Sequence, residues 1–137
     1  MSTKIFVNLP VKDLDRSVRF FTELGYTFDP RFTDETATCM VVSEDIYVML
    51  LTEPKFREFT PKDICDTSRY TEVLIALSAP SREAIDEMVR KAVAAGGSTY
   101  CEPQDHGFMY QHGFQDPDGH IWELVYMEPS ALAPQPA

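Results

Sequence analysis

Asp116-Pro-Asp-Gly-His-Ile-Trp-Glu-Leu-Val125 joins a tight turn to the beginning of a strand. Pro117 restricts φ, and Gly119 can adopt the positive φ that closes a turn. The two aspartates that flank Pro117 can accept hydrogen bonds from nearby backbone amides. The apolar residues after Gly119 are aromatic or mostly β-branched and occur at both parities, so the sequence predicts a strand that is covered on both faces.

Glu123 is a carboxylate in the middle of this expected strand. A charged side chain at a covered strand position needs a cation, hydrogen-bond partners or a raised pKa, and these are more typical of a functional site than of a core. We therefore prefer a metal ligand or general base as the interpretation. The alternative is a structural carboxylate that pairs with an arginine, a backbone amide or water.

The composition limits the classes of partner. The chain has 137 residues, which suits one domain with its own core, and its formal net charge is -10. An acidic chain without a basic cluster repels phosphate groups, so neither nucleic acid nor a membrane is an expected partner. The three widely spaced cysteines, the lack of a signal-peptide pattern and the lack of a membrane-spanning stretch predict a cytoplasmic protein with reduced thiols.

The two halves of the chain repeat one order of elements. Each half begins with a strand, continues with an amphipathic helix that ends at a glycine, and closes with three short strands. The expected strands are 4–11, 26–32, 36–42, 46–51, 71–78, 98–102, 108–115 and 121–127. The sequence thus predicts a single domain over 1–128, with modules at about 4–52 and 70–128, a linker at about 53–69 and a flexible tail at 129–137.

These features resemble the vicinal oxygen chelate superfamily, which includes glyoxalase I (lactoylglutathione lyase), bleomycin-resistance proteins, extradiol dioxygenases and fosfomycin-resistance thiol transferases. The resemblance is carried by the stretch that ends at Glu123, by Val11-Lys-Asp-Leu-Asp-Arg-Ser-Val-Arg-Phe-Phe-Thr-Glu-Leu-Gly25 and by Ala94-Ala-Gly-Gly97. It implies an α+β fold in which two βαβββ modules form an eight-stranded cupped sheet with helices on the outer face. It also implies a homodimer and a divalent metal held by four strand residues inside the cup.

Only one of the four ligand positions that the resemblance implies holds a suitable side chain. Glu123 matches the last position, whereas the other three fall on Phe6, on or beside Met49, and on Leu74. These side chains do not suit Zn²⁺, Mg²⁺, Mn²⁺ or Fe²⁺, which take imidazole or carboxylate ligands. We therefore expect no cofactor, and a divalent metal on a different set of ligands is the alternative.

Strand parity predicts what lines the cup in place of a metal centre. With Glu123 as the candidate catalytic residue, the candidate ligand-binding residues are Phe6, Asn8, Tyr47, Met49, Glu72, Leu74, Tyr110 and His112. A lining that is mostly apolar with a few polar groups suits a small organic molecule held by shape and a few hydrogen bonds.

The histidines and the acidic turns give further expectations. Tyr110 and His112 share a parity, so both face either the cup or the layer of helices. His120 is three residues from Glu123, an odd separation that places the two side chains on opposite faces of a strand. We therefore expect His120 to cap the turn or to face solvent, and the acidic turn residues to lie at the solvated surface.

Two classes of function follow from the resemblance. In the first, the protein is a lyase, isomerase or dioxygenase relative with a degenerate metal site, in which Glu123 acts as base or ligand and Asn8, Glu72, Tyr110 or His112 assist. In the second, it sequesters a drug or metabolite without catalysis, as bleomycin-resistance proteins do. A standard metal-dependent glyoxalase I is not expected in either case.

The replaced ligand positions predict the metal content of the protein. Elemental mass spectrometry of protein purified without chelator should find well under one equivalent of transition metal per chain, because three of the four implied ligand positions lack a suitable donor. A stoichiometric metal that is lost in Glu123→Ala would show that the strand register used for these positions is wrong.

Overall fold

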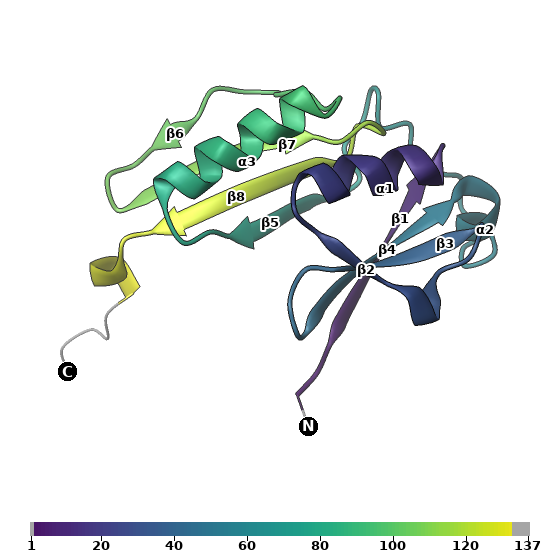
Figure 1. Cartoon of the computed structure of the whole chain (residues 1–137). Coiled ribbons are helices and arrows are strands. Elements are labelled where there is room, and N and C mark those ends of the chain that lie inside the picture. The colour runs from purple at the N-terminus through teal and green to yellow at the C-terminus, as the bar shows by residue number, and fades with distance from the viewer. Residues whose placement is uncertain (1, 133–137) are drawn as a thin grey trace. The chain divides into compact units, whose positions relative to one another are not determined.

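The computed structural model describes residues 2–132 and divides into two compact units, Met1–Tyr70 and Thr71–Ala137 (Figure 1). The division falls at the end of the predicted linker, and the single domain over 1–128 stays a prediction. The expected tail begins with a short 3-10 helix at Pro129–Leu132, and its remainder, 133–137, lies outside the described residues. Among residues 2–132, no helix has the length and hydropathy of a membrane span.

The first unit is a four-stranded sheet with strand order β1-β4-β3-β2. β1 runs parallel to β4, and the other neighbouring pairs are antiparallel. Alternate residues of β1 and β4, such as Leu9, Val48 and Leu50, are buried with Phe20 and Phe21 of α1. The elements are β1 Ile5–Val11, α1 Leu14–Glu23, β2 Thr27–Asp29, a 3-10 helix Pro30–Phe32, β3 Ala37–Val41, β4 Ile46–Thr52 and α2 Glu53–Arg57.

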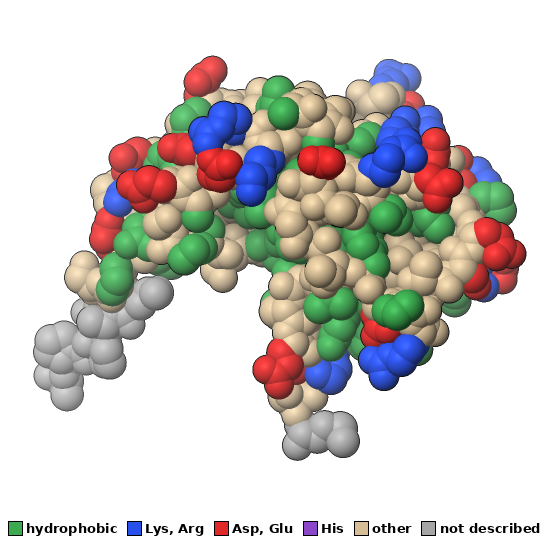
Figure 2. Space-filling model, in the orientation of Figure 1, with side chains coloured by type: hydrophobic (Ala, Val, Ile, Leu, Met, Phe, Trp, Pro, Cys, Tyr) green, Lys and Arg blue, Asp and Glu red, His purple; other side chains and the backbone are tan. Residues whose placement is uncertain are grey.

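The second unit repeats this plan, with strand order β5-β8-β7-β6. Helix α3 packs against β7 and β8, and its buried residues Ile85, Val89 and Ala92 share the core with Phe114 and Trp122. Basic and acidic side chains are mixed over the outer surface of α3 (Figure 2). The elements are β5 Leu74–Ser78, α3 Arg82–Ala94, β6 Gln104–Asp105, β7 Met109–Gln115 and β8 Ile121–Met127.

Local sequence signals explain where the two long helices begin and end. The side chains of Asp13 and Ser81 accept hydrogen bonds from the backbone amides of Arg16 and Ala84, which satisfies free donors at each helix N-terminus. Gly25 and Gly96 follow the helices with φ of 100° and 111°, a conformation that favours glycine. The predicted α+β class with two βαβββ modules is confirmed.

Several predicted elements differ from the structure. The strand expected at 98–102 is reduced to one bridge between Ser98 and Gln115, and the edge strand β6 forms later. The strand expected at 26–32 ends after three residues, because Pro30 begins a 3-10 helix. The expected linker contains the short helix α2.

The turn before β8 is buried at its two ends, Asp116 and His120, and half-buried between them, so Asp116 does not lie at the solvated surface as expected. Asp116 is 5% exposed, and its carboxylate accepts hydrogen bonds from the amides of Asp118 and His120 and, at 3.1 Å, from the indole Nε1 of Trp122. Gly119 closes the turn with φ of 86°. Burial raises the pKa of Asp116, while the charge of His120 and these hydrogen bonds act in the opposite direction.

His120 belongs to the turn, as one of the two expected positions has it, and its side chain is buried rather than facing solvent. It is 2% exposed, and its Nδ1 lies 2.7 Å from Oε1 of Glu72. The parity rule used for His120 applies inside a strand, but His120 precedes β8 and belongs to the turn. Glu72, a candidate ligand-binding residue, is therefore engaged with the turn that leads into β8.

The buried hydrogen bonds of Asp116 predict a large effect on stability. Asp116→Ala should lower the free energy of unfolding by about 2 kcal/mol or more, because it leaves buried donors without an acceptor. Urea unfolding followed by the fluorescence of Trp122, the single tryptophan, measures the change in this unit. The control is Glu83→Ala, an exposed carboxylate in the first turn of α3, which should cost less than about 1 kcal/mol. Equal losses of unfolding free energy in Asp116→Ala and Glu83→Ala would contradict the stabilising role of the Asp116 hydrogen bonds.

Candidate functional site

Glu123 lies at the centre of β8 between two small neighbours. It is opposite Gly113 of β7 and beside Ala76 of β5. Residues that are paired across strands share a face of the sheet, so the side chain of Glu123 has no large neighbour on either side. We call this face, with Leu74, Ala76, Gly113, Glu123 and Val125, the Glu123 face. The opposite face, which carries Trp122 and Leu124 and is covered by α3, is the helix face.

Tyr100 occupies the space that Gly113 leaves. A Cβ built on Gly113 would collide with the hydroxyl of Tyr100 and with the carbonyl oxygen of Trp122. Only glycine at this position lets the phenol approach the sheet so closely. Burial, the charge of Glu123 and a hydrogen bond to its carboxylate together raise the pKa of Tyr100 to about 12. Tyr100 is thus a neutral hydroxyl that donates to Glu123.

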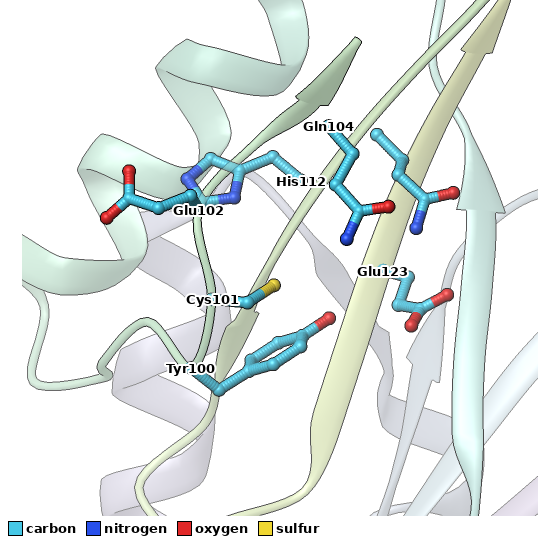
Figure 3. A pocket seen from close by; sticks show the side chains of 7 residues that line it. Tyr100, Cys101, Glu102, Gln104, His112 and Glu123 are labelled. Carbon is cyan, nitrogen blue, oxygen red and sulfur yellow. The ribbon is translucent and has the colours of Figure 1, made fainter. Parts of the chain in front are cut away.

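A pocket opens at the edge of β7 where the pairing of this strand is interrupted. Ser98 pairs with Gln115, the chain then leaves β7, and it pairs again at Gln104, opposite Gln111. The side chains of Tyr100, Gln104 and Glu123 point towards one another in this gap (Figure 3). The pocket has a volume of about 150 Å³ and is lined by Tyr100, Cys101, Glu102, Gln104, Gln111, His112 and Glu123.

The predicted site residues of the second unit are distributed over both faces of its sheet. Tyr110 faces α3, where its hydroxyl donates to Oδ1 of Asp86 at 2.6 Å. Leu74 is exposed and lies on the Glu123 face. His112 has the parity of the helix face but also lines the pocket at the edge of β7. Its Nδ1 is buried and has no hydrogen-bond partner among residues 2–132.

The predicted site residues of the first unit share one face of the other sheet. Phe6 is paired with Tyr47, and Asn8 is paired with Met49. The rings of Phe6 and Tyr47 stack with their centroids 4.9 Å apart, and Phe6 is 51% exposed. The structure thus brings these four side chains together, as strand parity predicts.

The side chains at the implied metal positions do not fit a divalent metal. Phe6 and Met49 in the first unit and Leu74 in the second offer no oxygen or nitrogen donor, and Glu123 offers one carboxylate. Within residues 2–132, no group of three or more His, Cys, Asp or Glu side chains is arranged to hold a metal ion. We therefore assign no step of any reaction to a metal.

Most of the pocket was not predicted from the sequence. The residues that were missed are Tyr100, Cys101, Glu102, Gln104 and Gln111. One signal was available: Gly113 interrupts an otherwise aromatic and polar strand opposite Glu123, and a glycine inside a strand often marks the close approach of another segment.

The N-terminal part of the chain matches a known protein family. Residues 3–43 match the family described as bleomycin resistance protein-like N-terminal. No curated protein matches the chain. The match includes β1, α1, β2 and β3, and it does not extend to the pocket around Glu123.

Solved structures show that the fold is shared over nearly the whole chain. Hypothetical protein SA1046 from S. aureus is 26% identical with a TM-score of 0.77, covering 92% of this chain and 95% of its own. A glyoxalase/bleomycin resistance protein/dioxygenase family enzyme from Burkholderia phytofirmans PsJN is 15% identical with a TM-score of 0.76, covering 93% and 100%. The fosfomycin resistance protein FosX from Mesorhizobium loti is 16% identical with a TM-score of 0.68, covering 97% and 99%. These comparisons confirm the resemblance to the vicinal oxygen chelate superfamily at the level of the fold.

The contact between Tyr100 and Glu123 predicts a shifted tyrosine titration. Phenolate absorbance of the wild type minus that of Tyr100→Phe should give a midpoint of about 12 for Tyr100. The difference is needed because hydrogen bonding to Asp86 also raises the pKa of Tyr110 to about 12. Since the folded-state pKa lies above the ordinary value of about 10, the stabilisation from this contact is present below pH 10 and is lost as pH rises through 12.

The matched variants for this titration are Glu123→Gln and Glu83→Gln. Glu123→Gln removes the neighbouring negative charge, so the pKa of Tyr100 should fall towards its ordinary value. Glu83→Gln, on the exposed surface of α3, should leave it unchanged. An unchanged Tyr100 midpoint in Glu123→Gln would contradict the contact.

Proposed function

We propose that this chain, which has the glyoxalase and bleomycin-resistance fold, binds a small organic molecule in the pocket beside Glu123. The observation that carries the proposal is the convergence on one pocket of the Glu123 carboxylate and the neutral hydroxyl of Tyr100, whose close approach to the sheet Gly113 permits. Small-molecule sites are typically concave and contain a few polar groups that orient the ligand. Homodimerisation stays a prediction of the resemblance.

The size of the pocket limits the ligand. A volume of about 150 Å³ is close to that of an engineered cavity that accepts benzene, so one ring or a short chain fits. Carboxylate, phenol, amide, thiol and imidazole groups line this pocket. A ligand that gains affinity here therefore needs polar groups of its own, because an apolar molecule would leave buried polar atoms without partners.

The same pair of groups supports a second candidate function, catalysis by proton transfer. Glu123 can accept a proton from a carbon acid or a hydroxyl group, and Tyr100 can donate a hydrogen bond to charge that develops on the bound molecule. The hydroxyl of Tyr100 is protonated at neutral pH, as in an ordinary tyrosine, and its pKa of about 12 extends this state to higher pH. Non-catalytic sequestration requires only that the same groups orient the ligand.

Cys101 provides a direct test of binding. It is exposed and lines the pocket, whereas Cys39 is buried and Cys65 lies in the other unit. A molecule bound in the pocket should slow the alkylation of Cys101 by iodoacetamide and leave the alkylation of Cys65 unchanged, as measured by peptide mass spectrometry. We expect at least one compound from a panel of one-ring anions, cations and neutral molecules to protect Cys101, with weaker protection in Glu123→Gln.

The outcomes of this test separate the two candidate functions. NMR shows whether a protecting compound is converted to a product. Conversion by the wild type but not by Glu123→Gln would support catalysis. Protection without conversion would support sequestration. If no compound of the three charge classes protects Cys101, the proposal of a binding pocket beside Glu123 is wrong.

A further inference from the structure

We infer that the molecule bound beside Glu123 is a small organic cation, with an ammonium or amidinium group that contacts the Glu123 carboxylate. This inference rests on the proposed binding function and adds the chemical class of the ligand. It is carried by three observations: the charges that line the pocket, the positions of all cationic side chains in the second unit, and the acceptor atoms that Glu123 and Tyr100 present at the site.

The lining of the pocket is negatively charged. Glu102 and Glu123 are carboxylates, and the seven lining residues include neither Lys nor Arg. Tyr100 is neutral at neutral pH, so it contributes no charge that balances Glu123. An anionic ligand would meet repulsion here, whereas a cation would gain a charge-assisted hydrogen bond.

The cations of the second unit lie on the other side of its sheet. Residues 71–137 contain ten Asp or Glu and only three Lys or Arg, which are Arg82, Arg90 and Lys91. All three belong to α3, which covers the helix face (Figure 1). Arg82 is bound to Glu128, Asp105 and the carbonyl oxygen of Gly107, and Arg90 pairs with Glu87. Within this unit, the Glu123 face therefore has no cation of its own.

Glu123 and Tyr100 offer hydrogen-bond acceptors to a cation in the pocket. Glu123 keeps free lone pairs after it accepts from Tyr100, and the phenol oxygen has lone pairs of its own. His112 is not part of this set, because it has the parity of the helix face and its ring points away from Tyr100, Gln104 and Glu123 (Figure 3). An ammonium group carries three donors and no acceptor, so this set of groups suits it.

Three probes of similar shape test the charge of the ligand: benzylammonium, benzyl alcohol and benzoate. Each has one ring, as the pocket volume requires, and they differ in the charge of the polar group. Protection of Cys101 from alkylation and calorimetric titration both give an affinity. We expect benzylammonium to bind about tenfold or more tightly than benzyl alcohol, since a hydrogen bond to a charged group contributes about 1.5–3 kcal/mol, and benzoate to bind weakest.

Matched variants connect this preference to Glu123. Glu123→Gln should weaken benzylammonium binding by about tenfold or more and leave benzyl alcohol binding nearly unchanged. Glu83→Gln, on the exposed surface of α3, should change neither affinity. Glu102→Gln, in an exposed loop, is the variant to use if Glu123→Gln fails to fold. It should weaken the binding of benzylammonium more than the binding of benzyl alcohol.

The possible results distinguish the inference from the function on which it rests. If benzyl alcohol or benzoate protects Cys101 as well as benzylammonium does, the pocket binds ligands and the inferred charge class is wrong. If none of the three probes protects Cys101, the inference fails, and the larger panel then decides on the proposed function. Selective benzylammonium binding that Glu123→Gln abolishes would support both.

Discussion

The hydrogen bonds of the buried Asp116 carboxylate are the constraint on which the second unit depends. They hold the amides of Asp118 and His120 and the indole of Trp122, and so they fix where the turn ends and β8 begins. Because side chains alternate along a strand, a shift of one residue would turn Glu123 towards α3 and Trp122 away from the core. The position of the candidate catalytic carboxylate thus follows from a turn seven residues earlier in the chain.

Once this register is set, the residues opposite Glu123 decide what its side chain can do. Gly113 has no side chain, and Ala76 has only a methyl group, so the carboxylate is not covered by its strand neighbours. The room over Gly113 is filled by Tyr100, whose hydroxyl donates to Glu123. A glycine in a strand usually weakens it. Here it allows a phenol and a carboxylate to meet beside a pocket.

The sequence predicted those features that depend on neighbouring residues and failed where distant segments meet. The limits of β8 and the two βαβββ modules follow from local turns and periodicity. Tyr100 was missed because its position depends on how the chain leaves and rejoins the edge of β7, which no local pattern encodes. Two positions were left open for His120, and the structure places it in the turn with its side chain buried against Glu72. Strand parity did not decide on which face of the sheet Tyr110 lies. Its hydrogen bond to Asp86 of α3 places it on the helix face.

The sheet of the second unit also separates its charges. On the helix face, Arg82 neutralises Glu128, and the guanidinium lies over the rings of Tyr110 and Tyr126. The Glu128 carboxylate is therefore already paired within the fold. Glu123 lies beside the neutral hydroxyl of Tyr100, and the three Lys and Arg residues of the second unit all belong to α3, so its charge is not balanced inside its own unit. A half-buried carboxylate without a counterion is costly unless a ligand, a proton or solvent compensates it, and this cost is the physical reason to look for a cation at this position.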